Sequence, residues 1–120
     1  NGLHGWEYTE DEYGAAFPDM IKAIRKNAPN AKLIWATTTP IRTGKYCERL
    51  EERVARIVTR NEIAQKHISK AKDIKTNDLF NLILDHPEYF IGGDGVHPID
   101  KGYQVLAEQV AKKILESLSE

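Results

Sequence analysis

Cysteine is almost absent from this chain. Cys47 is the single cysteine among 120 residues, so no disulfide can form within the chain, and one thiol leaves the cellular compartment undetermined. Neither sign of charge dominates, because 17 Lys and Arg face 18 Asp and Glu and the net charge is −1. An electrostatic nucleic-acid binder would carry a strongly basic surface. We therefore expect no nucleic-acid partner.

Long apolar runs are missing as well. The longest, from Leu33 to Ala36, has the length of a strand, whereas a membrane-spanning helix needs roughly 20 apolar residues. Neither of the two common Gly-rich phosphate loops occurs. The histidines and the cysteine do not have the spacing of metal ligands. We expect no membrane partner, no metal and no organic cofactor.

The hydrophobic pattern predicts helices and strands in alternation. Thr9 and Glu12 form a capping-box pattern at the start of a first helix, which Pro18 should bend and which should end at residues 27–30. Further on, helical spacing predicts a solvent-facing His67 and places Asn61 on an apolar stripe, where it should bond to a nearby loop. The remaining predicted elements are a strand at 32–38, a helix at 47–70, a strand at 73–78, a short helix or loop at 81–91 and a helix at 99–118, whose apolar face would be Tyr103, Leu106, Val110, Ile114 and Leu118.

This alternation is typical of a parallel α/β sheet with crossover helices. Two strands make a poor sheet, because their edges and the helix faces around them would be left uncovered. We therefore interpret residues 1–120 as the C-terminal portion of one larger α/β domain whose N-terminal strands are absent from this chain. The missing strands would come from another segment, a second chain or a second copy.

The segment most suggestive of chemistry is the Gly-rich loop before the last helix. Asp94 lies three residues before His97, with Gly95 between them and Pro98 directly after. A carboxylate that bonds one ring nitrogen holds a histidine in the tautomer that a general base requires. Glycines allow the tight turn, and proline suits the first turn of the helix that follows. On its own, an Asp-x-x-His pattern is equally a surface loop with a capping acid and an ordinary histidine.

The surroundings of this pair favour the catalytic interpretation. The run from Asp94 to Pro98, followed by Gly102-Tyr103 and Leu106-Ala107, resembles the last conserved block of the SGNH, or GDSL, family of esterases and lipases. The segment from Asn1 to His4 is similar to the third block of that family. The strand from Leu33 with its Thr-rich end, the helix with Asn61 and the run Asn77-Asp78-Leu79 follow in matching order.

The resemblance implies a fold, a reaction and residue roles. The fold would be the C-terminal part of a flavodoxin-like three-layer α/β/α SGNH hydrolase domain, with a parallel sheet. The reaction would be serine-dependent ester hydrolysis, with His97 as general base and Asp94 as its orienting acid. In such enzymes the serine lies in a Gly-Asp-Ser motif near the N-terminus, and that motif does not occur in these 120 residues.

The third block also departs from the family pattern, Gly-x-Asn-Asp. Here the register gives Gly2-Leu3-His4-Gly5, so His4 stands where an asparagine would donate to the oxyanion. A neutral imidazole N–H can do so. Asn1 is the competing donor, chemically closer but three residues early, and both residues are also compatible with a purely structural place in the loop.

The expected substrate is a small-molecule or carbohydrate ester, with deacetylation as one possibility. Trp6, Thr38, Thr39 and Val96 are candidate pocket residues, because ligands gather beyond the carboxyl ends of parallel strands. Trp6 is equally suited to packing its loop, and the threonines to closing a strand end. The alternative to catalysis is a non-catalytic fragment that self-associates or complements a missing N-terminal half.

Overall fold

The computed structural model describes residues 8–44 and 49–120. In chain order the elements are α1 (Glu10–Ala15), α2 (Phe17–Asn27), β1 (Leu33–Ala36), α3 (Leu50–Ile68), β2 (Ile74–Asn77), α4 (Leu79–Leu84), the 3₁₀ helix η1 (Pro87–Phe90) and α5 (Asp100–Leu118). The predicted order of helices and strands is confirmed. The structure resolves the predicted segment at 81–91 into α4 and η1, separated at Asp85 and His86.

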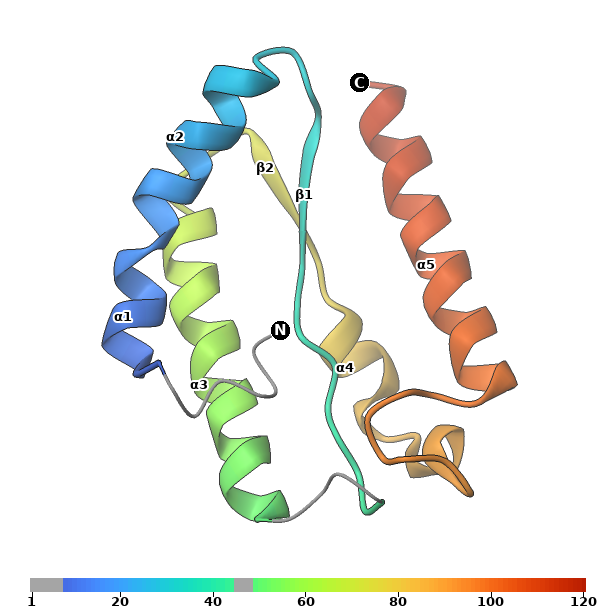
Figure 1. Ribbon diagram of the computed structural model, residues 1–120. Helices are drawn as coiled ribbons and strands as arrows, with labels where there is room; N and C mark the ends of the chain where they lie inside the picture. Colours follow the sequence, from blue (N-terminus) through green and yellow to red (C-terminus); the bar gives the residue numbers. More distant parts are fainter. Residues whose placement is uncertain (1–7, 45–48) are drawn as a thin grey trace.

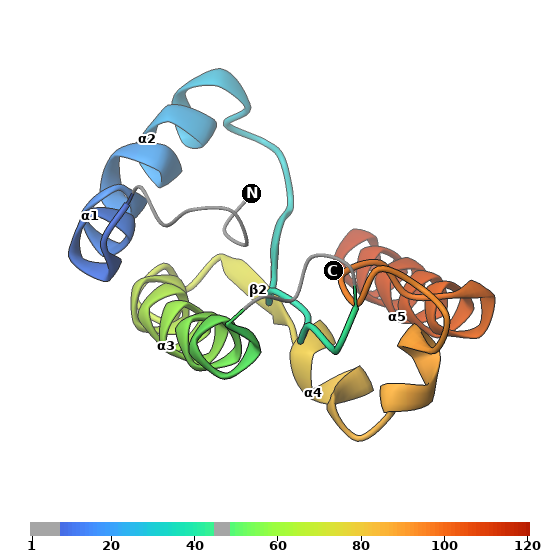
Figure 2. The same ribbon diagram turned by 60° about the horizontal axis from the view of Figure 1, so that its bottom comes forward.

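Two parallel strands form the centre of the molecule. Leu33 of β1 is opposite Ile74 of β2, and the register runs to Ala36 opposite Asn77. Helices α1, α2 and α3 lie on one side of the strands and α5 on the other, as Figures 1 and 2 show. This arrangement confirms the α/β class and gives three layers. Within the described residues, β1 pairs with β2 alone.

The first helix begins as the capping pattern predicts. The Thr9 hydroxyl accepts the backbone N–H of Glu12, and the Glu12 carboxylate accepts the Thr9 N–H at 2.7 Å. These bonds satisfy two donors that a helix start leaves open. Pro18 lies in the first turn of α2, where its missing N–H costs little. The chain therefore divides at Ala16 into two helices.

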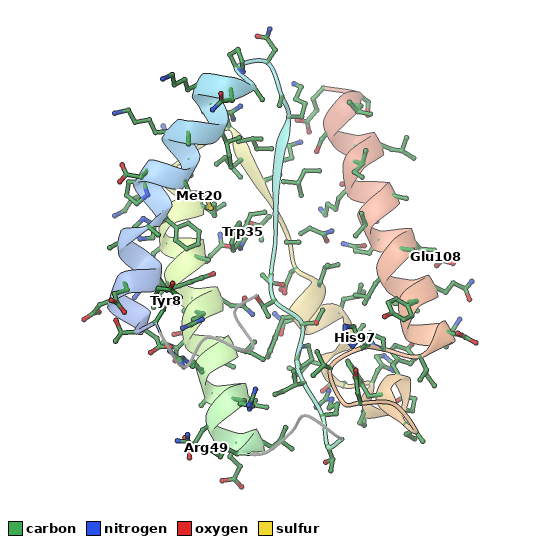
Figure 3. All side chains as sticks on the ribbon, in the orientation of Figure 1. Tyr8, Met20, Trp35, Arg49, His97 and Glu108 are labelled. Atoms are coloured by element: carbon green, nitrogen blue, oxygen red, sulfur yellow. The ribbon has the colours of Figure 1, made fainter. Side chains whose placement is uncertain are left out.

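The larger apolar core joins these helices to α3 and the sheet. Phe17 is 2% exposed and packs with Ala64 and Ile68, and its ring meets that of Trp35 at a centroid distance of 5.1 Å. Figure 3 shows Trp35 between β1 and the α1–α3 layer. His67 also belongs here, since its ring stacks on Phe17 at 5.2 Å. The prediction of a solvent-facing His67 was wrong, because the side chain is half-buried on this core.

A second core holds the elements around the Asp94 loop. Ile83 of α4 packs with Tyr89 and Phe90 of η1, and Val105 and Leu106 of α5 cover them. Gly102 belongs to the same contact, because a Cβ there would lie 2.8 Å from the Cβ of Tyr89 and 2.7 Å from that of Pro98. The absence of a side chain at Gly102 lets the first turn of α5 rest directly on η1.

The inward face of α5 differs from the predicted apolar face. Gln109 points to the sheet and donates to Asn77 Oδ1 at 3.2 Å, and Ser117 is buried. Of the predicted apolar residues, Leu106 packs inward, whereas four are exposed to the extent of 37–69%: Tyr103, Val110, Ile114 and Leu118. Helical periodicity identified an apolar stripe correctly, but that stripe is left uncovered by the described residues. No helix in the described part of the chain is long and apolar enough to cross a bilayer.

Candidate active site

The candidate site lies beyond the carboxyl ends of β1 and β2, where ligands bind in open α/β sheets. Figure 3 shows His97 near this end of the strands, beside the start of α5. Two segments meet here, residues 37–44 after β1, which we call the β1 loop, and residues 92–98 before α5. Both are held by specific hydrogen bonds.

The start of the β1 loop is held by Asn61 of α3. The Asn61 side chain accepts the Thr38 N–H and donates to the Thr38 carbonyl, each at 2.9 Å. The prediction that Asn61 bonds to a nearby loop is confirmed. Next to it, the Thr37 hydroxyl accepts the N–H of Phe80 at 2.8 Å and donates to Asp78 at 3.3 Å. The ends of both strands are thereby joined to each other and to α3.

Asp94 organises the turn that carries His97. Its Oδ1 accepts the backbone N–H of Val96 at 2.8 Å and that of His97 at 2.7 Å. A short acidic side chain commonly closes a turn in this way. Gly95 has φ of +82°, a left-handed conformation that glycine adopts without the cost a side chain would add. The sequence pattern Asp-Gly-x-His thus determines the local backbone.

The other carboxylate oxygen of Asp94 contacts the histidine ring. Oδ2 lies 2.6 Å from Nδ1 of His97, and the His97 side chain is 69% exposed. The His97 backbone N–H, its ring and the Val96 N–H together lower the pKa of Asp94 from 3.8 to about 2. Asp94 is therefore an anion at neutral pH, able to hold Nδ1 protonated and to leave Nε2 as a proton acceptor.

The end of the β1 loop lies directly against the Asp94 turn. The Arg42 N–H donates to the Gly95 carbonyl at 2.7 Å. Gly44 approaches so closely that a Cβ there would lie 2.3 Å from the carbonyl carbon and oxygen of Asp94. Sequence analysis missed this role of Gly44. The only available signal was a glycine a few residues after a Thr-rich strand end, and such a glycine is common in any loop.

Two open clefts flank these segments. One, of about 520 Å³, lies between α3 and the end of β2 and is lined by Thr37, Val58, Asn61, Glu62, Gln65, Thr76, Asp78, Phe80 and Asn81. The other, of about 420 Å³, is lined mainly by apolar residues of the β1 loop, α3 and η1, namely Ile41, Arg42, Thr43, Leu50, Val54, Pro87, Phe90, Ile91 and Gly92. The second cleft borders the loop that leads to Asp94.

The structure brings together some of the predicted site residues. Asp94, Val96 and His97 share one turn. Thr38 and Thr39 are half-buried at the end of β1, but neither lines the two clefts, where Thr37 stands instead. Their predicted role in a pocket remains a prediction. The predictions for Asn1, His4 and Trp6 fall outside the described residues. Among residues 8–44 and 49–120, no three His, Cys, Asp or Glu side chains gather as metal ligands would.

The sequence matches the model of the GDSL-like lipase/acylhydrolase family over residues 2–110. The chain belongs to this family. Its three-layer arrangement (Figures 1 and 2) fits that membership. No similar protein was found among the curated sequences.

A comparison with solved structures also supports this fold. The chain is similar to the esterase domain of the ORF1 protein from the zebrafish ZfL2-1 retrotransposon, with a TM-score of 0.75 and 22% sequence identity. The match covers 91% of this chain and 61% of that one. The family fold is therefore established for this chain, which spans about three fifths of the length of that esterase domain.

Proposed function

We propose that this chain supplies the general base and its orienting acid to a serine-dependent carboxylic-ester hydrolase. The observation that carries the proposal is the 2.6 Å contact between Asp94 Oδ2 and His97 Nδ1, in the loop that enters α5 of a GDSL-family chain. The second carboxylate oxygen is occupied by two backbone N–H groups, so the acid is held in place on the side away from the ring.

The reaction would begin with proton transfer to His97. A serine hydroxyl attacks the ester carbonyl carbon while Nε2 of His97 takes the hydroxyl proton, and the negative charge of Asp94 stabilises the imidazolium. The tetrahedral intermediate collapses as the carbon–oxygen bond to the alcohol breaks. His97 returns the proton to the departing alkoxide, and an acyl-serine remains.

The second half of the reaction repeats these steps with water. His97 removes a proton from a water molecule as its oxygen attacks the acyl-serine carbonyl. Collapse of the second intermediate releases the carboxylic acid, and the proton returns through His97 to the serine oxygen. Neither half requires a metal or an organic cofactor. The oxyanion donor would be His4 or Asn1, and the substrate a small-molecule or carbohydrate ester, with acetyl esters as the first to try.

The serine would come from a segment outside these 120 residues. The serines of this chain are Ser69, Ser117 and Ser119. Ser69 and Ser119 cap the ends of α3 and α5, and the Ser117 hydroxyl donates to the carbonyl of Lys113 within α5. None of the three lies at the carboxyl ends of the strands, where the Asp94 turn is.

Two uncovered surfaces fit a serine-bearing segment. The outer edge of β1 has no strand partner among the described residues, and in a flavodoxin-like order further strands continue a sheet at such an edge. The exposed stripe of α5, from Tyr103 to Leu118, is large and apolar. The match leaves 39% of the related esterase domain, by difference from 61%, without a counterpart in this chain.

A complementation assay tests the proposal. The chain would be purified alone and together with the segment of its gene that carries Gly-Asp-Ser, and hydrolysis of p-nitrophenyl acetate would be followed for both. We expect turnover with the segment and none above background without it. Loss of turnover in His97→Ala of the combined protein would support the assigned role, whereas full activity in that variant would refute it.

The absence of a Gly-Asp-Ser motif favours one second candidate for the chain by itself. Its free strand edge and apolar α5 stripe could pair two copies, as in swapped dimers, and yield a binding protein without catalysis. A stable dimer in sedimentation equilibrium, with no ester hydrolysis after addition of the serine-bearing segment, would favour this alternative.

A further inference from the structure

The β1 loop connects α3 to the Asp94 turn through backbone contacts at both of its ends. At its start, the Asn61 side chain holds both polar groups of the Thr38 backbone at 2.9 Å. At its end, Arg42 donates to the Gly95 carbonyl at 2.7 Å, and Gly44 lies against the peptide between Asp94 and Gly95. Between these ends, Pro40 and Ile41 are buried and give the loop an apolar anchor.

The side chain of Arg42 connects the same loop to α4 and η1. It donates to the backbone carbonyls of Ile83 and Leu84 at the end of α4, and its guanidinium lies 5.9 Å from the centre of the Phe90 ring. The carbonyls at a helix end lack partners within the helix, so a cation there is favourable. One short loop thus contacts α3, α4, η1 and the Asp94 turn.

From these contacts we infer that the β1 loop is a positioning element for the Asp94–His97 pair. Asn61 fixes the start of the loop, and Gly44 brings its end against the Asp94–Gly95 peptide. This inference rests on the proposed function, since a positioning role has meaning only if the pair is catalytic. Gly44 and Asn61 would be positioning residues, because Gly44 touches the backbone that carries the pair and Asn61 holds the loop that contains Gly44, and neither touches the reacting atoms.

The chemistry explains why this contact matters. The Asp94 carboxylate contacts the His97 ring through a 2.6 Å hydrogen bond, and the imidazole itself is 69% exposed. The position of the Asp94 backbone therefore decides where Nε2 stands relative to the serine. Misplacement of a catalytic group by about 1 Å can cost on the order of 10²-fold in rate.

Gly44→Ala tests the inference directly. The new methyl group would meet backbone atoms at 2.3 Å, which cannot move aside as a flexible side chain can, so the Asp94 peptide and the β1 loop must shift relative to each other. In the complete enzyme, including its serine-bearing segment, we expect kcat to fall by about 10²-fold with little change in KM. We also expect the pKa of Asp94, followed by the chemical shift of its carboxyl carbon, to rise from about 2 toward 3.8 as its N–H donors move away.

A second variant guards against a folding defect in the first. Asn61→Asp keeps an acceptor for the Thr38 N–H but places a carboxylate against the Thr38 carbonyl in place of a donor. We expect it to shift kcat and the Asp94 pKa in the same direction by a smaller amount. The control is Ile68→Val in the Phe17 core, which is mildly destabilising but distant from the loop, and should change neither.

The outcomes separate this inference from the proposed function. If folded Gly44→Ala or Asn61→Asp retains the wild-type kcat and an Asp94 pKa of about 2, the β1 loop does not position the pair. If both variants raise the Asp94 pKa while even the wild-type complete protein lacks activity, the structural coupling stands and the proposed function fails. A similar loss of kcat in Ile68→Val would also overturn the inference, because general destabilisation would then explain it.

Discussion

Nδ1 of His97 lies 2.6 Å from Oδ2 of Asp94, and the two residues share a single turn. Both residues belong to one short segment, so the hydrogen bond between Asp94 and His97 forms within that segment. The position of the Asp94–His97 pair, in contrast, depends on contacts with the rest of the molecule. The β1 loop, η1 and the first turn of α5 all contact the backbone of this turn or of its flanks.

Replacement of His97, the proposed general base, should abolish most of the proposed activity. In the protein completed by the proposed serine-bearing segment, His97→Ala should lower kcat by about 10²–10⁴-fold, the usual contribution of a positioned base. Asp94→Ala is expected to do less harm, since Nε2 remains. The matched control is His86→Ala, a partly exposed histidine with an acidic partner, Glu88 at 2.6 Å, whose ring also stacks on Tyr89 at 4.7 Å. Equal loss in the control would show that the effect is not specific to His97.

The Asp94 turn should make stability depend on acid pH. The pKa of Asp94 is lowered to about 2 from 3.8, so its ionised form stabilises the fold above pH 3.8, and this contribution is lost as the pH falls through about 2. Asp94→Asn cannot ionise and should show a smaller drop in unfolding free energy between these pH values. Urea unfolding at several pH values measures the difference. An equally steep drop in the variant would contradict the assignment.

Replacing Gly102 with alanine should change the free energy of unfolding in the direction opposite to that of an ordinary helical glycine. In an ordinary helix, replacing glycine with alanine stabilises by about 1 kcal/mol. Here a Cβ would lie 2.7–2.8 Å from Pro98 and Tyr89, so α5 must move away from η1. We expect Gly102→Ala to be destabilising by about 1–3 kcal/mol, as for other overpacked sites. Denaturant unfolding checks this, and a gain in stability would contradict the close contact.

The apolar stripe of α5 should be needed for assembly with the proposed serine-bearing segment. Ile114→Glu places a charge in the middle of that stripe, where Ile114 is 44% exposed. We expect it to weaken association with the segment, measured by sedimentation or by co-purification, and to lower the yield of active protein. Lys112→Glu changes the charge on the same helix at another exposed position and serves as the control. Equal association of both variants would show that the stripe is not the contact surface.

Much of the architecture could be predicted from local signals. The capping box at Thr9, Pro18, the apolar run of β1 and the Asp94–His97 spacing each act within a few residues, and the structure has the helices, strands and turn that they predict. Asn61 was also recognised, because a polar residue on an apolar stripe needs a partner.

The remaining features depend on contacts that are distant in sequence. Periodicity identifies the apolar stripe of α5 but not which side meets the sheet, and in this structure Gln109 faces Asn77 while Tyr103 and Val110 are exposed. The contact of Gly44 with Asp94 joins residues 50 positions apart, the difference between 94 and 44. No local sequence pattern predicts such a contact. His67 lay beyond prediction for the same reason, since its partner Phe17 comes from another helix.

The most direct test of the central claim is labelling with a serine-directed fluorophosphonate, followed by peptide mapping. The complete protein would be treated as wild type and as His97→Ala, and the modified peptide identified by mass spectrometry. We predict that the label lies on the serine of a Gly-Asp-Ser segment outside these 120 residues, and that labelling slows strongly without His97. A label on Ser69, Ser117 or Ser119, or an unchanged labelling rate in His97→Ala, would contradict the assignment of this chain as the source of the base and the acid.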